Sequence, residues 1–465
     1  MVFVNRTDEL AGLNRWWDRG DAQMGMVWGR RRVGKTALIQ EFARDRPTIS
    51  HTFAGRPPQD ELRLLSLSAA DVINDPVRDL RESPFRDWDE VFEVIGRAAA
   101  HKRILLVLDE FPDTLPTHPQ LPNLIRAHWD RLRHHSQLRL LLCGSAVRTM
   151  EKLRETSAPL YGRFDLFLLL HPFAPSEVGK LLPALAPADR ALVWGIVGGT
   201  PLYLSWWDQG RTVKDNLLDL ACRPDGRLFV EGAQVLERET FGDLGRQVLF
   251  ALGSGRTKFH EIANAVGTDP TRTLDRLIQL RLVERLVPVT DSDRSRRRIY
   301  RVADNFLDFW LSCLSRHGTE IERDMGSGVV STLIQQLDDH MGGAWEQAFR
   351  IHLRALANLG FLKNIVALDR FWRDPEGDPE TGAGFRPSIE IDAVALAGLS
   401  RQPVLAGEAK WARVVDAERI RTSLEEKARW IPGAHPADMH FTVCARDRVE
   451  NGGHVLAITA GDIFA

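Results

Sequence analysis

Cysteine is scarce in this sequence, and the few cysteines lie far apart. The 465 residues contain four of them, at positions 143, 222, 313 and 444, and no two have C-x-x-C spacing. A disulfide framework and a zinc site of that kind are therefore excluded. Long apolar runs are also missing, because none approaches the ~20 residues that a membrane-spanning helix needs. The first residues show no signal-peptide pattern, so we expect a soluble protein of a reducing cytoplasm, with no membrane partner.

Net charge is nearly absent as well. The chain has 61 Lys and Arg against 63 Asp and Glu, a formal charge of -2 at pH 7. This balance excludes the uniformly basic class of nucleic-acid coat proteins, so any contact with DNA must come from local patches. Hydrophobic residues make up 44% and charged residues 27%, as in ordinary globular proteins, and the length predicts about two to four domains.

The most informative stretch lies at residues 27–36. It fits the phosphate-binding pattern G-x-x-x-x-G-K-[ST] at every fixed position, with Gly29, Gly34, Lys35 and Thr36. The glycines allow backbone N–H groups to converge on a triphosphate, Lys35 reaches the β- and γ-phosphates, and Thr36 offers its hydroxyl to Mg²⁺. ATP and Mg²⁺ are therefore the predicted ligands, and the other predicted contacts of the loop are Arg32, Val33 and Ala37.

Two acids end the next clear strand. Residues 104–108 form an uninterrupted apolar run, typical of a strand buried on both faces of a parallel sheet, and Asp109 and Glu110 follow at once. Such acids face the crevice at the carboxyl ends of the strands, where ligands bind. Asp109 is predicted to hold Mg²⁺ and Glu110 to polarise the attacking water. The alternative is a solvated acidic turn.

Two further residues are candidates for contact with the γ-phosphate. Ser145 follows the apolar strand 138–142 and is either a phosphate or water contact or an ordinary turn residue. Arg163 precedes another apolar strand, 166–170, and is either a charge-stabilising arginine or an exposed one. An Arg163 that acts on a second copy of the chain would require a homo-oligomer.

With these motifs in place, the chain resembles the archaeal-type P-loop ATPases related to the AAA and STAND signalling ATPases. Residues 3–10 are similar to the F-x-x-R-x-x-E-L box of that group. The arginine-rich filling of the phosphate loop, the acidic end of the third strand and residues 198–204 resemble its other motifs. The resemblance implies a nucleotide-dependent switch or motor, with Arg6 and Pro201 near the adenine base.

The next segment reads as helix, helix, turn, helix and hairpin, which is the plan of a winged helix. The helices are expected at 244–252, 258–266 and 271–280, and the strands at 282–287 and 299–302. DNA contact and packing onto the nucleotide domain are both open, because aspartates dilute the basic face. The basic residues of that face are Arg272, Arg276, Arg294, Arg296, Arg297 and Arg298.

Two successive strands near the end of the chain carry acids and a lysine. Side chains alternate along a strand, so Asp392 lies on an apolar face of the first, and Glu408 and Lys410 share one side of the second. We expect Asp392 and Glu408 to coordinate Mg²⁺ or Mn²⁺ and Lys410 to position the attacking water. Glu346, on a preceding helix, is expected to reach the same cation.

This D…E-x-K pattern with a preceding helical glutamate resembles the PD-(D/E)xK restriction-endonuclease-like superfamily, and residues 407–411 resemble the C-terminal domain attached to these ATPases. An E-x-K pair alone is also a common solvated ion pair on surface strands. Domains of this superfamily often keep the fold after losing the chemistry. The resemblance therefore implies a nuclease fold and leaves its activity open.

The predicted fold class is α/β, in three domains. Residues 1–230 form a P-loop NTPase parallel sheet with a helical lid, 231–320 a winged-helix domain and linker, and 321–465 a restriction-endonuclease-like domain. The predicted function is ATP hydrolysis coupled to a nuclease-like domain that acts on DNA as a Mg²⁺-dependent deoxyribonuclease. The alternative is a STAND-like ATP switch without nuclease activity that regulates the binding of DNA or protein.

Overall fold

The computed structural model describes residues 5–73, 78–239, 242–375 and 388–465, so Phe3 and Val4 of the N-terminal box lie outside the described residues. The chain divides into two compact units, residues 1–172 and 173–465. The division falls inside the predicted first domain, because the expected helical lid clusters with the later part of the chain. All four cysteines are buried without disulfides. In the described ranges, no helix is long and apolar enough to cross a membrane.

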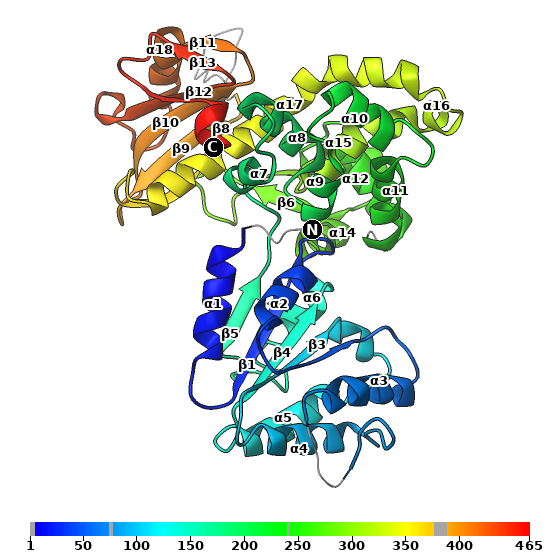
Figure 1. Cartoon of the computed structure of the whole chain (residues 1–465). Coiled ribbons are helices and arrows are strands. Elements are labelled where there is room, and N and C mark those ends of the chain that lie inside the picture. The colour runs from blue at the N-terminus through cyan, green and yellow to red at the C-terminus, as the bar shows by residue number, and fades with distance from the viewer. Residues whose placement is uncertain (1–4, 74–77, 240–241, 376–387) are drawn as a thin grey trace. The chain divides into compact units, whose positions relative to one another are not determined.

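The first unit is built on a parallel sheet of five strands in the order β2-β3-β4-β1-β5. Figure 1 shows its strands and flanking helices in blue to cyan. The strands are β1 (Gln23–Trp28), β2 (Thr48–Thr52), β3 (Ile104–Asp109), β4 (Leu138–Gly144) and β5 (Leu166–Leu169). The helices are α1 (Thr7–Trp17), α2 (Lys35–Ala43), α3 (Pro58–Ala70), α4 (Trp88–Ala98), η1 (Phe111–Thr114), α5 (Leu121–Leu132) and α6 (Val147–Lys152).

Both faces of this sheet are covered. On β3, Leu106 and Leu108 belong to a core shared with α3, α4 and α5, whereas Leu105 and Val107 belong to a second core shared with α1 and α2. All six residues of β3 are buried. A strand enclosed in this way must be apolar along its whole length, which explains the uninterrupted run in the sequence.

The second unit begins with helices. They are α7 (Pro175–Leu181), α8 (Pro187–Val197), α9 (Pro201–Trp206), α10 (Val213–Leu220), α11 (Arg227–Glu239), α12 (Asp243–Gly253), α13 (Phe259–Val266) and α14 (Thr271–Gln279). The antiparallel pair β6 (Val283–Leu286) and β7 (Ile299–Val302) follows α14. The connection to the next part consists of α15 (Asn305–Phe309), the π-helical turn η2 (Trp310–Leu314), η3 (Ser315–His317) and α16 (Gly318–Glu322).

One long helix, α17 (Gly326–Asn358), joins this helical part to a second sheet. Its first half packs on α7, α8 and α10, and its second half packs on β8, β9 and β10. The sheet has the order β14-β12-β10-β9-β8, with β8, β9 and β10 antiparallel and β10, β12 and β14 parallel. Its strands are β8 (Ile365–Arg373), β9 (Ile389–Ala397), β10 (Gln402–Lys410), β12 (His440–Ala445) and β14 (Leu456–Ile458). A separate parallel pair is formed by β11 (Val414–Asp416) and β13 (Arg448–Glu450), and the helices of this part are α18 (Ala417–Ala428), η4 (Pro436–Asp438) and α19 (Ala460–Ile463).

Gly199, in the motif at 198–204, lies against the first residue of the second unit. The N–H of Phe173 donates to the carbonyl oxygen of Gly199 at 2.7 Å, and a Cβ on Gly199 would stand 1.9 Å from the carbonyl oxygen of Phe173. Pro201 is the first residue of α9. The glycine of this motif therefore has a packing role at the start of the second unit.

Replacing Gly199 is expected to destabilise the fold, because the backbone of Phe173 must move to admit a methyl group. We expect Gly199→Ala to lower the free energy of unfolding by about 1–3 kcal/mol. The matched control is Gly343→Ala in the middle of α17, where nothing lies within 4 Å of the added methyl and helix propensity favours alanine by about 0.5–1 kcal/mol. Thermal unfolding of the two variants measures the difference, and a Gly199→Ala midpoint at or above wild type would contradict the packing role.

Candidate functional site

The loop between β1 and α2 has a backbone shape that glycine permits at both ends. Gly29 has φ +156°, and a Cβ there would stand 2.4 Å from the carbonyl oxygen of Leu170 after β5. Gly34, which precedes α2, has φ +91°. Arg32 between them also has a positive φ, 70°, although it is not a glycine. Such strain persists only where the surroundings enforce it, and it is common at functional sites.

Lys35 begins α2 and is buried, with only 6% of its surface exposed. Its ammonium donates to the carbonyl oxygens of Gly29 at 2.9 Å and Arg30 at 3.0 Å. A lysine has three such donors, so one remains for an anion. Burial lowers the pKa of Lys35, and the acids Glu110 and Asp109 nearby oppose that shift. A phosphate bound at this ammonium would favour its charged form further.

The remaining predicted phosphate contacts flank Lys35. Val33 is buried in the core beneath the loop, whereas Thr36 and Ala37 are exposed on the first turn of α2. The first N–H groups of a helix lack partners within the helix, and they carry its positive end. This turn can therefore receive an anion, as the sequence predicts.

Asp109 and Glu110 lie at the same edge of the sheet as the loop. The hydroxyl of Thr36 is 3.4 Å from Oδ2 of Asp109, which is 6% exposed. Glu110 has φ +49°, and its Oε2 accepts hydrogen bonds from the N–H of Ser145 at 2.9 Å and its hydroxyl at 2.8 Å. The carboxylate of Glu110 is therefore held in one place by Ser145. Arg31, which was not among the predicted site residues, donates to the hydroxyl of Ser145 at 3.4 Å.

Arg6 holds the loop from behind. It is 5% exposed, and its guanidinium donates to the carbonyl oxygens of Val33 at 3.0 Å and His171 at 2.6 Å and pairs with Glu9 at 2.8 Å. These contacts fasten the phosphate loop to α1 and to the residue region after β5. They give Arg6 a positioning role, and its predicted proximity to an adenine base stays a prediction, as does that of Pro201.

Arg163 lies at the opposite edge of the sheet, so it makes no contact with the phosphate loop within the chain. Its guanidinium forms a two-point pair with Asp130 of α5 at 2.9 and 2.8 Å. Asp165, two residues later, accepts a hydrogen bond from the N–H of Met24 near the start of β1. The loop follows the other end of β1. Arg163 therefore does not reach the phosphate loop of its own chain, because parallel strands β1 and β5 begin at the edge where Arg163 stands. A charge-stabilising role of Arg163 on a second copy stays a prediction.

In the second unit, β9 and β10 bring Asp392 and Glu408 together. Asp392 is 7% exposed, and its Oδ2 accepts a hydrogen bond from the N–H of Ala409 at 2.8 Å. Burial, with the charges of Glu346 and Glu408, raises the pKa of Asp392 to about 7. The structure thus gathers the predicted acids in one region of the sheet.

Both carboxylate oxygens of Glu408 are bonded to ammonium groups. Oε1 lies 2.7 Å from Nζ of Lys410, and Oε2 lies 2.7 Å from Nζ of Lys427 on α18. Burial raises the pKa of Glu408, but the two lysines outweigh this effect and hold it below its ordinary value. Glu408 raises the pKa of Lys410 against the effect of burial, so the pair is charged at neutral pH.

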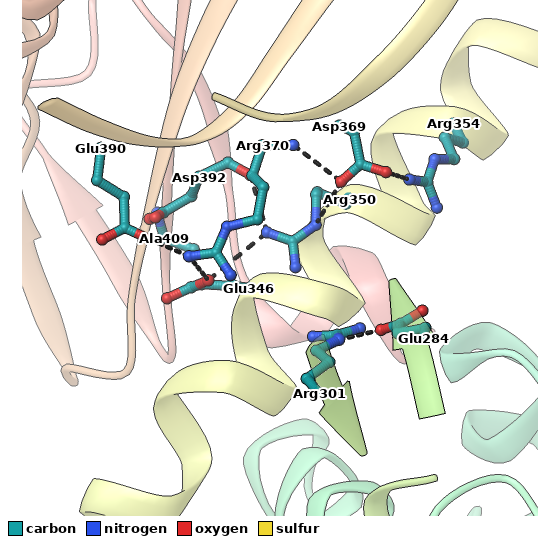
Figure 2. A network of polar contacts seen from close by, with 10 residues as sticks. All are labelled: Glu284, Arg301, Glu346, Arg350, Arg354, Asp369, Arg370, Glu390, Asp392 and Ala409. Atoms are coloured by element: carbon teal, nitrogen blue, oxygen red, sulfur yellow. Dashed lines mark hydrogen bonds and ion pairs between the residues drawn. The ribbon is translucent and has the colours of Figure 1, made fainter. Parts of the chain in front are cut away.

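Glu346 faces arginines, as Figure 2 shows. Its Oε2 lies 3.6 Å from the guanidinium of Arg350 and 3.9 Å from that of Arg370. Arg350 is 3% exposed and also donates to the backbone oxygen of Asp392 at 2.8 Å. Arg370 also pairs with Glu390.

The acids of the second unit do not form a ready metal site. In the part of the chain that the structure describes, no three His, Cys, Asp or Glu side chains are grouped closely enough to hold a metal ion. The charges of Glu346 and Glu408 are already compensated by arginines and lysines. The prediction that Glu346, Asp392 and Glu408 share a cation therefore disagrees with this arrangement. At the phosphate loop, Thr36 and Asp109 offer oxygen donors of the kind Mg²⁺ prefers, and they fit that ion.

Comparison with known proteins assigns the first part of the chain. Residues 3–206 match the family model described as an ATPase domain predominantly from Archaea. The match covers less than half of the chain. The match runs past the first unit and includes α7, α8, α9 and the motif at 198–204. Residues 310–422 match a second family model, described as Archaea bacterial proteins of unknown function.

Similar proteins span the whole chain or only part of it. An uncharacterised protein of Methanocaldococcus jannaschii is 24% identical over 472 residues, which covers 98% of each chain. An uncharacterised ATP-binding protein of the same organism is 50% identical over 42 residues, 9% of this chain and 71% of that protein. Among solved structures, the Walker-type ATPase of Pyrococcus abyssi is 19% identical with a TM-score of 0.49, covering 66% of this chain and 96% of that one.

Several residues around the two sites escaped sequence reasoning. Arg31 occupies a variable position of the phosphate-binding motif, so the motif does not identify it as a site residue. Arg350 follows Glu346 by four residues, a helical spacing that was readable and predicts an ion pair. Lys427 and Arg370 come from elements that approach the site only in the folded chain.

Because Arg163 lies far from the phosphate loop of its own chain, we predict that loss of its side chain does not impair ATP turnover by the monomer. Arg163→Ala is expected to leave the ATP turnover of dilute protein near the wild-type value and to cost about 0–1 kcal/mol of stability, as for other partly exposed ion pairs. Asp130→Asn, which breaks the same pair, is the matched control. Turnover measured over a range of protein concentrations tests this, and a loss that appears in Arg163→Ala alone and grows with concentration would instead show that Arg163 acts on a second copy.

Proposed function

We propose that the chain is an ATP-binding and ATP-hydrolysing switch whose catalytic groups lie at the carboxyl edge of the first sheet. The observation that carries this proposal is the arrangement of Lys35, Thr36, Asp109 and Glu110 at one edge, with Glu110 fixed by two hydrogen bonds from Ser145. The match of residues 3–206 to an ATPase family model supports it.

Each residue has a separate task in this proposal. Lys35 turns its remaining donor to the β- and γ-phosphates, and the exposed first turn of α2 receives them with its N–H groups. Thr36 and Asp109 would hold Mg²⁺, which when bound neutralises charge on those phosphates. Glu110 orients the attacking water and accepts its proton as a general base. Ser145 holds the Glu110 carboxylate in position to do so.

Substitutions at this edge separate binding from chemistry. Glu110→Gln is expected to bind ATP normally and to lower turnover by about 10²–10⁴-fold, the usual contribution of a general base. Lys35→Ala is expected to lose both ATP affinity and ATP turnover, because it removes the buried ammonium that contacts the phosphates. Binding of a fluorescent ATP analogue and release of phosphate measure the two effects.

The matched control for charge is Asp113→Asn, three residues after Glu110 and exposed. It should keep both binding and turnover close to wild type. Full turnover in Glu110→Gln would overturn the assignment of the base, and unchanged ATP affinity in Lys35→Ala would overturn the phosphate site itself.

We infer that nucleic acid, with DNA as the first choice, is the ligand of the second unit. Support comes from α12, α13, α14 and the β6–β7 hairpin, which follow one another as a winged helix requires. The loop of this hairpin exposes Arg294, Arg296 and Arg298, and no carboxylate among the described residues pairs with them. Exposed arginines without carboxylate partners are suited to phosphate contact.

A metal-dependent nuclease is the second candidate function. One observation favours it: Asp392, Glu408 and Lys410 lie together on neighbouring strands, with Lys410 2.7 Å from Glu408. The compensation of these charges by Lys427 and the nearby arginines supports the alternative instead, a switch whose C-terminal domain binds without cutting.

The nuclease candidate predicts that the full chain cuts DNA with Mg²⁺ or Mn²⁺, that EDTA stops the cutting, and that Lys410→Ala abolishes it. Arg413→Ala, on an exposed residue just after β10, is the matched control and should still cut. Single-stranded and duplex DNA are incubated with and without ATP and resolved on gels. Absence of cutting in a wild-type sample that turns over ATP would overturn the nuclease and leave the non-cutting switch.

A further inference from the structure

A cavity of about 330 Å³ lies in the second unit between the β6–β7 hairpin loop, the start of α13 and the end of β8. Its walls are fastened to one another. Lys258 and Ile299 form a β-bridge, which joins α13 to the hairpin. The ammonium of Lys258 lies 2.8 Å from Asp374, and the guanidinium of Arg297 donates to the backbone oxygen of Trp372 at 3.4 Å, which joins both to β8. The cavity is therefore a built feature of the fold.

The lining carries more positive than negative charge. Lys258 is matched by Asp374, and Arg297 is matched by Asp291 through two hydrogen bonds. Arg296 and Arg298 also line the cavity, and both are exposed without a carboxylate partner in the described ranges. Two arginines are thus left uncompensated at the mouth, and such a site attracts an anion. Guanidinium groups suit phosphate in particular, because they offer paired donors.

Aromatic rings complete the lining. Phe259 and the half-buried Trp372 both face the cavity. The guanidinium of Arg370 lies 5.7 Å from the ring centroid of Trp372. Arg370 covers one face of Trp372, so a base would stack on the other face. A phosphate site beside aromatic rings matches the chemistry of a nucleotide, whose base stacks while its phosphate pairs with arginine. In a duplex the bases are stacked on one another, so only an unpaired nucleotide can present its face to these rings.

We propose that this cavity binds one nucleotide unit of a single-stranded nucleic acid, with the phosphate at Arg296 and Arg298 and the base on Trp372. This inference rests on the proposed role of nucleic acid as a ligand of the second unit. It adds the location, which is the cavity shared by the hairpin and β8, and the preference for an unpaired strand. The third helix α14, where a winged helix commonly contacts a duplex, is outside this site.

The test compares two double variants of the full-length protein that remove the same charge. Arg296→Gln with Arg298→Gln alters the cavity, whereas Arg272→Gln with Arg294→Gln alters exposed arginines on α14 and the same hairpin loop that do not line it. The probe is a fluorescein-labelled dT20 strand, and its affinity is measured by anisotropy at several salt concentrations. The cavity variant is expected to bind at least about tenfold more weakly, with a salt slope smaller by about 0.7, since both arginines contact the same phosphate and one phosphate contact on a single strand contributes about 0.7.

The aromatic part has its own variants. Trp372→Leu is expected to weaken dT20 binding about tenfold, since stacking of one base on an aromatic side chain contributes an effect of this order. Trp372→Phe keeps a ring and should retain most of the affinity, which separates stacking from a folding defect. Thermal unfolding of every variant is recorded in parallel, and a loss of affinity counts only where the midpoint matches that of wild type.

Three results would overturn the proposal. Equal losses of affinity in the two double variants would show that the arginines act through general electrostatic attraction and not through the cavity. Tighter binding of a 20-base-pair duplex than of dT20 would contradict the preference for a single strand. Displacement of dT20 by dTMP at similar concentration would show that a free nucleotide is the ligand. ATP turnover and wild-type DNA binding are measured in the same samples. Wild-type protein that binds no DNA contradicts the nucleic-acid part of the proposed function, whereas binding that ignores the cavity variants contradicts this inference alone.

Discussion

The enclosure of a parallel sheet on both faces governs the first unit. Apolar side chains must cover both sides of β3 and β4, so polar groups are displaced to the strand ends. Arg139, the second residue of β4, illustrates this constraint: it is fully buried, and it donates to the carbonyl oxygens of Trp17 and Asp21, which precede β1. Burial lowers the pKa of Arg139 to about 10. The opposite edge is where the acids and the phosphate loop meet.

The second unit depends on a different constraint, the continuity of α17. A Cβ on Gly195 of α8 would stand 2.3 Å from the sulfur of Met341, so the first half of α17 is closely packed on the helices that continue the ATPase family match. Glu346, five residues after Met341, belongs to the ion-pair network beside the second sheet. A close-packed helix transmits displacement rather than absorbing it. The packing of α8 and the ion pairs beside β9 and β10 therefore depend on the same helix.

Local sequence patterns predicted much of this fold. Features that depend on tertiary neighbours were not predicted. The strands at β3, β4, β9 and β10 were readable, because burial dictates their composition. β8 was missed because it is an edge strand in which two consecutive charged residues, Asp369 and Arg370, and a register shift beside them interrupt the alternation of apolar residues. The length of α17 was hidden by Gly342 and Gly343, whose low helix propensity is overridden by the packing of the helix on both of its ends. The site motifs were readable, but the placement of Arg163 depended on which end of β1 lies beside it.

The two groups of charged residues also differ in how their charges are compensated, and this difference bears on function. At the phosphate loop, Lys35 uses two donors on backbone carbonyls, and the first turn of α2 is exposed. That site gains favourable interactions when an anion arrives. Around Asp392, lysines and arginines already occupy the carboxylates, so a cation must displace ammonium groups at an energetic cost. A site whose charges are satisfied from within the chain is stable without a ligand, whereas the phosphate loop is completed by one. The ATP site is therefore the part of this molecule whose structure most directly requires a ligand.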